Sequence, residues 1–268
     1  MTHGNRRATT TSRRGKDVSM ASQDDRAHAQ QHDLGEAVGG LADGGPDRAG
    51  VARVAKLAAS SLRTAGAKSV ASGRWLAEAL LDAVPHIPVR DATSLSGAYG
   101  GRTGDALAEE LIRAASRTTA GFGAVAGAMA GVEELAPPTW MAIPAELIVE
   151  TLAVVAVEMK LVAELQEVYG MPVTGSPFER STAVILGWAE GRGVTPSALV
   201  QKGGLAHAFG RTTRRELSKV LQRRLARRML RNTAALAPLM AGAVAGAELN
   251  RRATRALGEA VISDLTRR

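Results

Sequence analysis

Two uncharged stretches of this chain carry small residues at helical spacing, and both contain the hexapeptide Gly-Ala-Val-Ala-Gly-Ala. Residues four positions apart lie on one face of an α-helix. A strip of glycines on that face lets a second helix approach until the two backbones nearly touch. Both stretches are therefore expected to form closely packed helices. The glycines expected to provide the packing surface are Gly123, Gly127, Gly131, Gly242 and Gly246.

The remaining composition predicts an all-α protein. Aromatic residues make up only 3% of the chain, so alanine, leucine and valine must build the core, and such small side chains favour closely spaced helices. No segment alternates polar and apolar residues as a half-buried strand does. We expect a compact multi-helix bundle forming a single domain over residues 47–268. Residues 1–46 are polar, rich in glycine and without periodicity, which predicts a disordered tail.

Local start and stop signals divide the domain into successive helices. Asp47 is a capping residue, Pro85 stops a helix that begins near Gly73, and Ser176 to Glu179 form a capping box with proline at the first helical position. Residues 90–104 are expected to form a loop. The other expected helices run from Asp105 into the first glycine stretch, over residues 144–169, from Thr195, over about 213–231, and from the second glycine stretch to the C-terminus.

The length of the glycine stretches and the charges around them argue against simple membrane spans. The uncharged segments cover residues 118–132 and 233–247, and both are shorter than the roughly 20 residues that a spanning helix needs. Arginines flank the second segment on both sides, in conflict with the asymmetry of loop charge that orients a span. Two interpretations remain open: a re-entrant or interfacial hairpin, or a buried helix pair in a soluble bundle.

A basic amphipathic helix is predicted between Thr212 and Arg231, where Thr213 and Glu216 form a second capping box. Leu217, Leu221, Leu225 and Met229 recur at every fourth position and form an apolar stripe. On an anionic membrane the stripe would be buried and the cations would contact headgroups, whereas in a soluble bundle the stripe would face the core. The eight cations proposed to bind the membrane or another anion are Arg214, Arg215, Lys219, Arg223, Arg224, Arg227, Arg228 and Arg231.

Two carboxylates near the start of the 144–169 helix form a candidate cation site. Glu146 and Glu150 lie one turn apart in an otherwise apolar segment, a spacing that allows shared binding of a cation. The interpretation we favour is a polar helix face that continues through Glu158, Lys160 and Glu164. No metalloprotease, nucleophile-elbow or P-loop motif occurs in the chain. The sequence therefore predicts no catalytic residue, no metal site and no cofactor.

The second half of the chain resembles proteins of the EcsC family. The segment from Pro144, Pro-Ala-Glu-Leu-Ile-Val-Glu-Thr-Leu, closes on Tyr169-Gly170 as the central helix of that family does. The segment from Gly242 is similar to the family's C-terminal pattern, with Asn250, Thr254 and Gly258 at the matching places. The resemblance covers about residues 118–268. It implies a helical, membrane-proximal bacterial protein, and it carries over no catalytic residues.

Three functional hypotheses follow. The first is a non-enzymatic protein associated peripherally, or by a shallow hairpin, with the inner face of the bacterial membrane, where the net charge of +8 favours an anionic surface. The second is a soluble helical module that binds a protein or nucleic-acid partner through its basic helix; nucleic acid ranks lower because stacking aromatics are lacking nearby. The third is an enzyme that uses Glu146 and Glu150 around a metal. The sequence does not indicate an oligomeric state.

Overall fold

The computed structural model describes residues 29–65, 69, 73–130, 145–192 and 240–267, and five positions between 218 and 225. Every regular element in these residues is helical, which confirms the all-α prediction. The elements are a helix over residues 29–44, α2 (Arg48–Thr64), α4 (Arg74–Ala83), the short 3₁₀-helix η1 (Val84–His86), α5 (Ala92–Ala98), α6 (Gly104–Ala130), α7 (Ala145–Val168), α8 (Pro177–Gly191) and α11 (Met240–Leu265).

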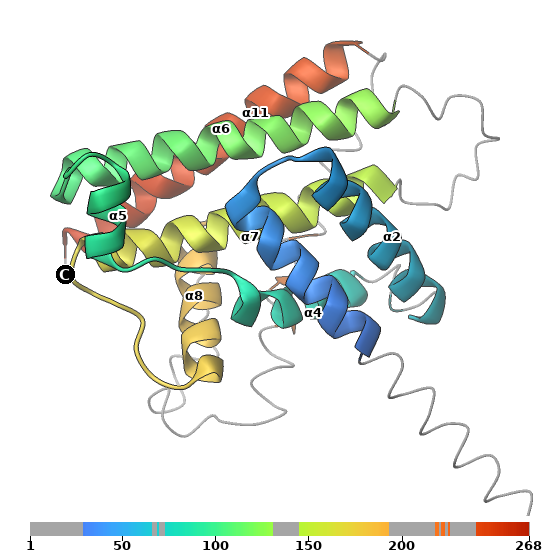
Figure 1. Ribbon diagram of the computed structural model, residues 1–268, viewed down its shortest axis with the longest axis horizontal. Coiled ribbons are helices and arrows are strands. Elements are labelled where there is room, and N and C mark those ends of the chain that lie inside the picture. The colour runs from blue at the N-terminus through green and yellow to red at the C-terminus, as the bar shows by residue number, and fades with distance from the viewer. Residues whose placement is uncertain are drawn as a thin grey trace, which may run out of the picture.

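Helix α7 lies at the centre of the described fold. Helices α6 and α11 run side by side along one side of it, α8 extends from the other side, and α2 and α4 lie toward one end (Figure 1). Every residue of α7 from Leu147 to Leu165 is buried, whichever face of the helix it occupies. This helix is too apolar all round to present a solvent face, and the fold surrounds it accordingly.

The expected disordered tail over residues 1–46 is wrong for its last third. Residues 29–44 form a helix whose Leu34, Val38 and Leu41 are buried in the core. Two of its glycines, Gly35 and Gly39, serve close packing, because a Cβ at Gly35 would lie 2.7 Å from the carbonyl oxygen of Asp82 and one at Gly39 would lie 2.5 Å from that of His86. Glycine content masked the apolar positions at helical spacing, which the sequence interpretation therefore missed. Residues 1–28 lie outside the described part of the chain.

The local signals for helix ends hold where the structure describes them. The backbone N–H of Gly50 donates to Asp47 Oδ1 over 2.9 Å, and Ser176 and Glu179 form both halves of the predicted capping box. The expected loop over residues 90–104 is wrong in part, since α5 begins after Asp91, whose side chain accepts from the N–H of Ser94. A helix this short lacks the apolar repeat that would reveal it. The second capping box, at Thr213 to Glu216, and the helix expected from Thr195 lie outside the described residues.

A tyrosine joins the end of α7 to the start of α6. Tyr169 Oη donates to Asp105 Oδ1 over 2.6 Å. Partial burial, together with this hydrogen bond, raises the pKa of Tyr169 from 10.0 to about 12. The protonated phenol is therefore favoured in the folded state.

This shift predicts a measurable effect at alkaline pH. Because the folded protein holds the phenolic proton more tightly than the unfolded chain, the contribution of Tyr169 to stability is present below the unfolded pKa of 10.0 and lost as pH rises toward about 12. The chain has two tyrosines, so a Tyr99→Phe variant isolates Tyr169 for an ultraviolet titration of tyrosinate. We expect a midpoint near 12, and a midpoint at the ordinary value would contradict the hydrogen-bonded arrangement.

Candidate functional site

The two glycine stretches meet in the seam between α6 and α11, which pack as antiparallel neighbours. A Cβ at Gly123 would lie 2.9 Å from the carbonyl carbon of Gly246 and from the backbone nitrogen of Ala247. Farther along the seam, a Cβ at Gly258 would lie 2.5 Å from Ile112 Cγ1. The two copies of the hexapeptide therefore pack against each other. Gly127 and Gly242 lie on α6 and α11 with undescribed surroundings, and Gly131 lies outside the described residues.

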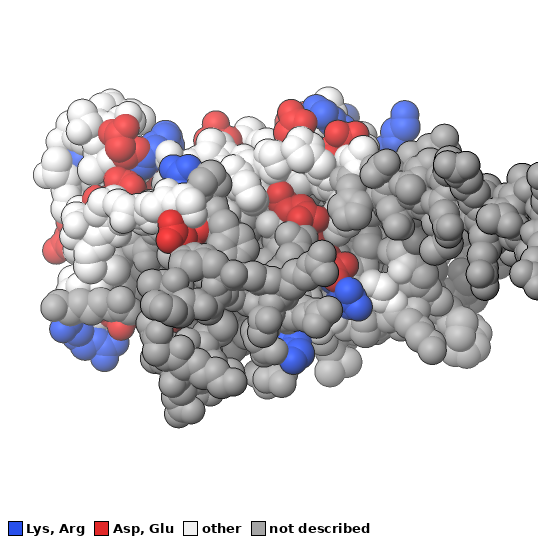
Figure 2. Space-filling model, turned by 90° about the horizontal axis from the view of Figure 1, so that it is seen from below, with Lys and Arg blue, Asp and Glu red and all other residues white. Residues whose placement is uncertain are grey.

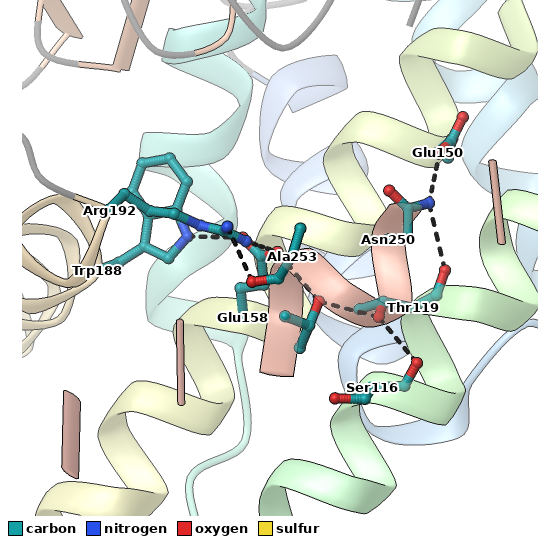
Figure 3. Close-up of polar contacts among 9 residues, drawn as sticks. Ser116, Thr119, Glu150, Glu158, Trp188, Arg192, Asn250 and Ala253 are labelled. Atoms are coloured by element: carbon teal, nitrogen blue, oxygen red, sulfur yellow. Dashed lines mark hydrogen bonds and ion pairs between the residues drawn. The ribbon is translucent and has the colours of Figure 1, made fainter. Parts of the chain in front are cut away.

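A buried polar network holds α7, α8 and α11 in register (Figure 3). Its centre is Glu158, whose side chain is 0% exposed and pairs with the guanidinium of Arg192. The carboxylate also accepts hydrogen bonds from Trp188 Nε1 over 2.9 Å and from Thr254 Oγ1 over 3.1 Å. A buried carboxylate costs free energy unless it is paired and hydrogen-bonded, and here both conditions are met. Arg192 also donates to the carbonyl oxygen of Ala253, which ties the end of α8 to α11.

A second part of the network joins α6, α7 and α11. Asn250 Nδ2 donates to Glu150 Oε1 over 2.6 Å and to the carbonyl oxygen of Thr119 over 3.4 Å. The hydroxyls of Thr119 and Thr254 share a hydrogen bond of 2.9 Å. The carboxylate expected to bind a cation is therefore engaged by an amide. The side chain of Glu146 lies outside the description, so the cation site stays a prediction.

A separate buried cluster surrounds Lys160 on α7. Its ammonium lies 2.9 Å from Glu164 Oε1 and 3.2 Å from Asp43 Oδ1, and it also donates to the carbonyl oxygen of Pro88. Arg90 reaches the same glutamate through two hydrogen bonds, which raise the pKa of Arg90. The prediction that Glu158, Lys160 and Glu164 form a polar face of this helix is therefore wrong, because all three residues are buried. Its charged residues are internal because neighbouring helices cover α7 on every side.

An open groove runs along the outer side of the α6–α11 seam. Its volume is about 640 Å³, and five arginines line it together with two glutamates, Glu109 and Glu259. All five guanidinium groups belong to exposed residues. Both helices contribute cations to the groove. The arginines are Arg113 and Arg117 on α6 and Arg251, Arg252 and Arg255 on α11.

Most of these arginines already have acidic neighbours on the surface. Arg251 and Arg252 share Glu248, and hydrogen bonds from both lower the pKa of that carboxyl from 4.5 to about 2. Arg255 Nε lies 3.0 Å from Glu259 Oε1, and Arg113 pairs with Glu110. Exposed pairs of this kind contribute little to stability and exchange readily. Among the described residues, Arg117 has no acidic partner.

The predicted basic helix is described at only five positions. Leu221 and Leu225 are 0% and 1% exposed, while Lys219 is exposed. At these two leucines the apolar stripe faces the protein core, so the version of the membrane hypothesis that buries them in the bilayer is wrong. The remaining cations, Arg214, Arg215, Arg223, Arg224, Arg227, Arg228 and Arg231, lie outside the described residues.

The groove arginines were not singled out from the sequence as a binding site. In the sequence, Arg251, Arg252 and Arg255 are simply charges that follow the second glycine stretch, and no pattern assigns a role to Arg113 or Arg117. The available signal was a pair of arginines four residues apart, Arg113 and Arg117, on the same helix as the glycine strip. Only the packing of α6 against α11 shows that the two sets of arginines face one groove.

Comparison of the chain with protein-family models, with curated proteins and with solved structures found no match. The resemblance of residues 118–268 to the EcsC family therefore stays a prediction. In the part of the chain that the structure describes, no helix combines the length and the apolar character needed to cross a bilayer.

Proposed function

We propose that this chain is a non-enzymatic helical protein that attaches peripherally to an anionic membrane surface, at the inner face of the bacterial membrane to which the EcsC resemblance points. The observation that carries the proposal is the set of five exposed arginines along the α6–α11 groove. Lysine or arginine near an anionic leaflet contributes about 1 kcal/mol per residue. Four of the five already pair with surface carboxylates, so each contributes less than this value and the attachment is weak and reversible.

The character of the attachment follows from where the apolar side chains lie. Leu221 and Leu225 are in the core and do not contribute to insertion. Val244 and Leu249 are 73% and 54% exposed on α11, within two turns of Arg251, and provide a limited apolar surface on the same helix. Attachment is therefore mainly electrostatic, with shallow apolar contact at most.

A second face of the molecule shows the described charges in a mixed arrangement (Figure 2). Figure 2 looks from below the view of Figure 1, whereas α6 and α11 lie along the top of that view. On the face in Figure 2, the acidic and basic residues that are described lie interspersed. Charges of mixed sign give little net attraction to an anionic leaflet. The assignment of the α6–α11 side to the membrane therefore rests on the arginines of the groove.

Vesicle flotation tests the proposal. We expect the protein to float with vesicles of phosphatidylcholine and phosphatidylglycerol and to stay unbound with phosphatidylcholine alone. Raising the salt concentration from about 0.1 M to about 1 M shortens the Debye length from about 10 Å to about 3 Å and should release the protein. Equal binding to neutral vesicles, or binding to neither, contradicts the proposal. The second outcome would favour a soluble module with a protein or nucleic-acid partner.

A further inference from the structure

We infer that the groove between α6 and α11 is a specific site for one phosphate group, carried by a small phosphate ester or by a lipid headgroup. The inference rests on the proposed function only where the phosphate belongs to a lipid. It goes beyond diffuse attraction between an arginine-rich surface and a membrane, because it assigns one ligand group to one concave place. Five arginines and two glutamates line it, and Glu110 and Glu248 pair with three of the arginines from just outside, so an excess of one positive charge remains for an anion.

The walls of the groove are rigid, so the arginine side chains project from well-placed backbones. The hydrogen bond between Thr119 and Thr254 and the contact of Gly258 with Ile112 hold the two helices together beneath the groove. Ile112 is itself part of the lining. Preorganised walls of this kind reduce the entropy lost when a ligand is bound.

The chemistry of the groove favours phosphate. A guanidinium group presents N–H donors in a planar fork that matches two phosphate oxygens. Arg117 is available in the described structure, since none of the described residues pairs with it. Arg255 is held only by its exposed pair with Glu259, and a phosphate dianion competes well against one surface carboxylate.

A buried hydroxyl gives an independent indication. Ser116 is 5% exposed and lines the groove, and its Oγ has no hydrogen-bond partner among the described residues. Buried hydroxyls are nearly always hydrogen-bonded, because leaving one unsatisfied costs about 1–3 kcal/mol. After a change of side-chain rotamer, a phosphate oxygen bound between Arg117 and Arg255 would supply the missing partner.

The groove has room for more than the phosphate itself. Its volume of about 640 Å³ falls in the range typical of small-molecule sites, roughly 300–1,000 Å³. The ester group attached to the phosphate therefore also fits within it. Ile262 and Ile112 provide apolar lining for that part of the ligand.

Titration calorimetry with inorganic phosphate and with glycerol phosphate tests the inference on the full chain. We expect saturable binding, and Arg117→Gln should raise the dissociation constant about tenfold, the effect expected for one charge-assisted pair. The matched control is Arg53→Gln, which removes from α2 an arginine that is also exposed and has no acidic partner among the described residues. The control should leave the dissociation constant within about twofold of the original protein.

A second pair of variants predicts a gain in affinity, which a merely structural role would not produce. Glu259→Gln releases Arg255 and should tighten phosphate binding about two- to fivefold. Glu78→Gln on α4 breaks a pair of the same i, i+4 geometry with Arg74, far from the groove in sequence, and should not tighten it. Circular dichroism checks that each variant is folded.

The outcomes separate this inference from the proposed function. Lack of saturable phosphate binding, or equal effects of Arg117→Gln and Arg53→Gln, overturns the groove site even if anionic vesicles still bind. Saturable binding that responds to Arg117→Gln upholds it even if no vesicle binds. A preference for phosphatidate over phosphatidylglycerol vesicles at equal surface charge, relieved by soluble phosphate, identifies the ligand as a lipid headgroup. Phosphate binding without that preference identifies a soluble phosphate ester.

Discussion

Replacing Arg192 with alanine is expected to lower the free energy of unfolding by about 3–5 kcal/mol, because it leaves a buried carboxylate without its cation. Glu158 is 0% exposed, and the Arg192 guanidinium is its only ion-pair partner among the described residues. The remaining donors, Trp188 Nε1 and Thr254 Oγ1, are neutral and do not compensate the charge. Urea denaturation followed by circular dichroism measures the loss.

Two further variants identify the cause of this loss. Arg180→Ala removes an exposed arginine from the same helix α8 and should change stability by no more than about 0.5 kcal/mol. Adding Glu158→Gln to Arg192→Ala removes the uncompensated charge but keeps an acceptor for Trp188, so most of the lost stability should return. If the double variant is no more stable than Arg192→Ala, the loss comes from packing and not from the buried charge.

Replacing Gly123 with alanine is expected to destabilise the protein, although alanine is the better helix former. The new Cβ would lie 2.9 Å from the backbone of Gly246 and Ala247, and backbone atoms in a helix seam cannot move aside singly. Overpacking of this kind costs about 1–3 kcal/mol. The gain in helix propensity from glycine to alanine is about 1 kcal/mol or less and does not offset the larger costs in that range.

Gly40→Ala is the matched control for this substitution. Gly40 also lies within a helix, but nothing stands within 4 Å of the Cβ that would be added. The same chemical change should therefore stabilise the protein by about 0.5–1 kcal/mol. Thermal or urea unfolding of both variants gives the comparison. Equal shifts of the two variants in the same direction would contradict a close approach of α6 and α11 at Gly123.

Helix ends were predictable because their causes are local. The capping box of Ser176 and Glu179 spans one turn, and Asp47 bonds an N–H three residues ahead. The helix over residues 29–44 was missed because glycines and polar residues surround its few apolar positions, and only contact with Asp82 and His86 explains Gly35 and Gly39. Such contacts join residues far apart in the sequence, so no local pattern reports them.

The buried network was even less accessible to sequence reasoning. Glu158 lies 34 residues from Arg192 and 96 from Thr254, and these partners come from two other helices. On a helical wheel, the charged residues of α7 are most simply explained as a face toward solvent. They are internal because six other helices of the described fold, α2, α4, α5, α6, α8 and α11, contact α7. A solvent-facing charged face and an internal one differ only in whether other helices cover it, and the sequence of α7 alone does not determine that.

The sequence by itself determined the all-α class, most helix boundaries and the need for close packing at the repeated Gly-Ala-Val-Ala-Gly-Ala. Each of these depends on residues within a few turns of one another, where spacing alone sets the geometry. The tertiary structure decided that Gly123 meets Gly246, that the charges of α7 are inside, and that arginines of two helices share one groove. Those outcomes depend on which helix faces meet, and that choice is made by the burial and pairing of the whole chain together.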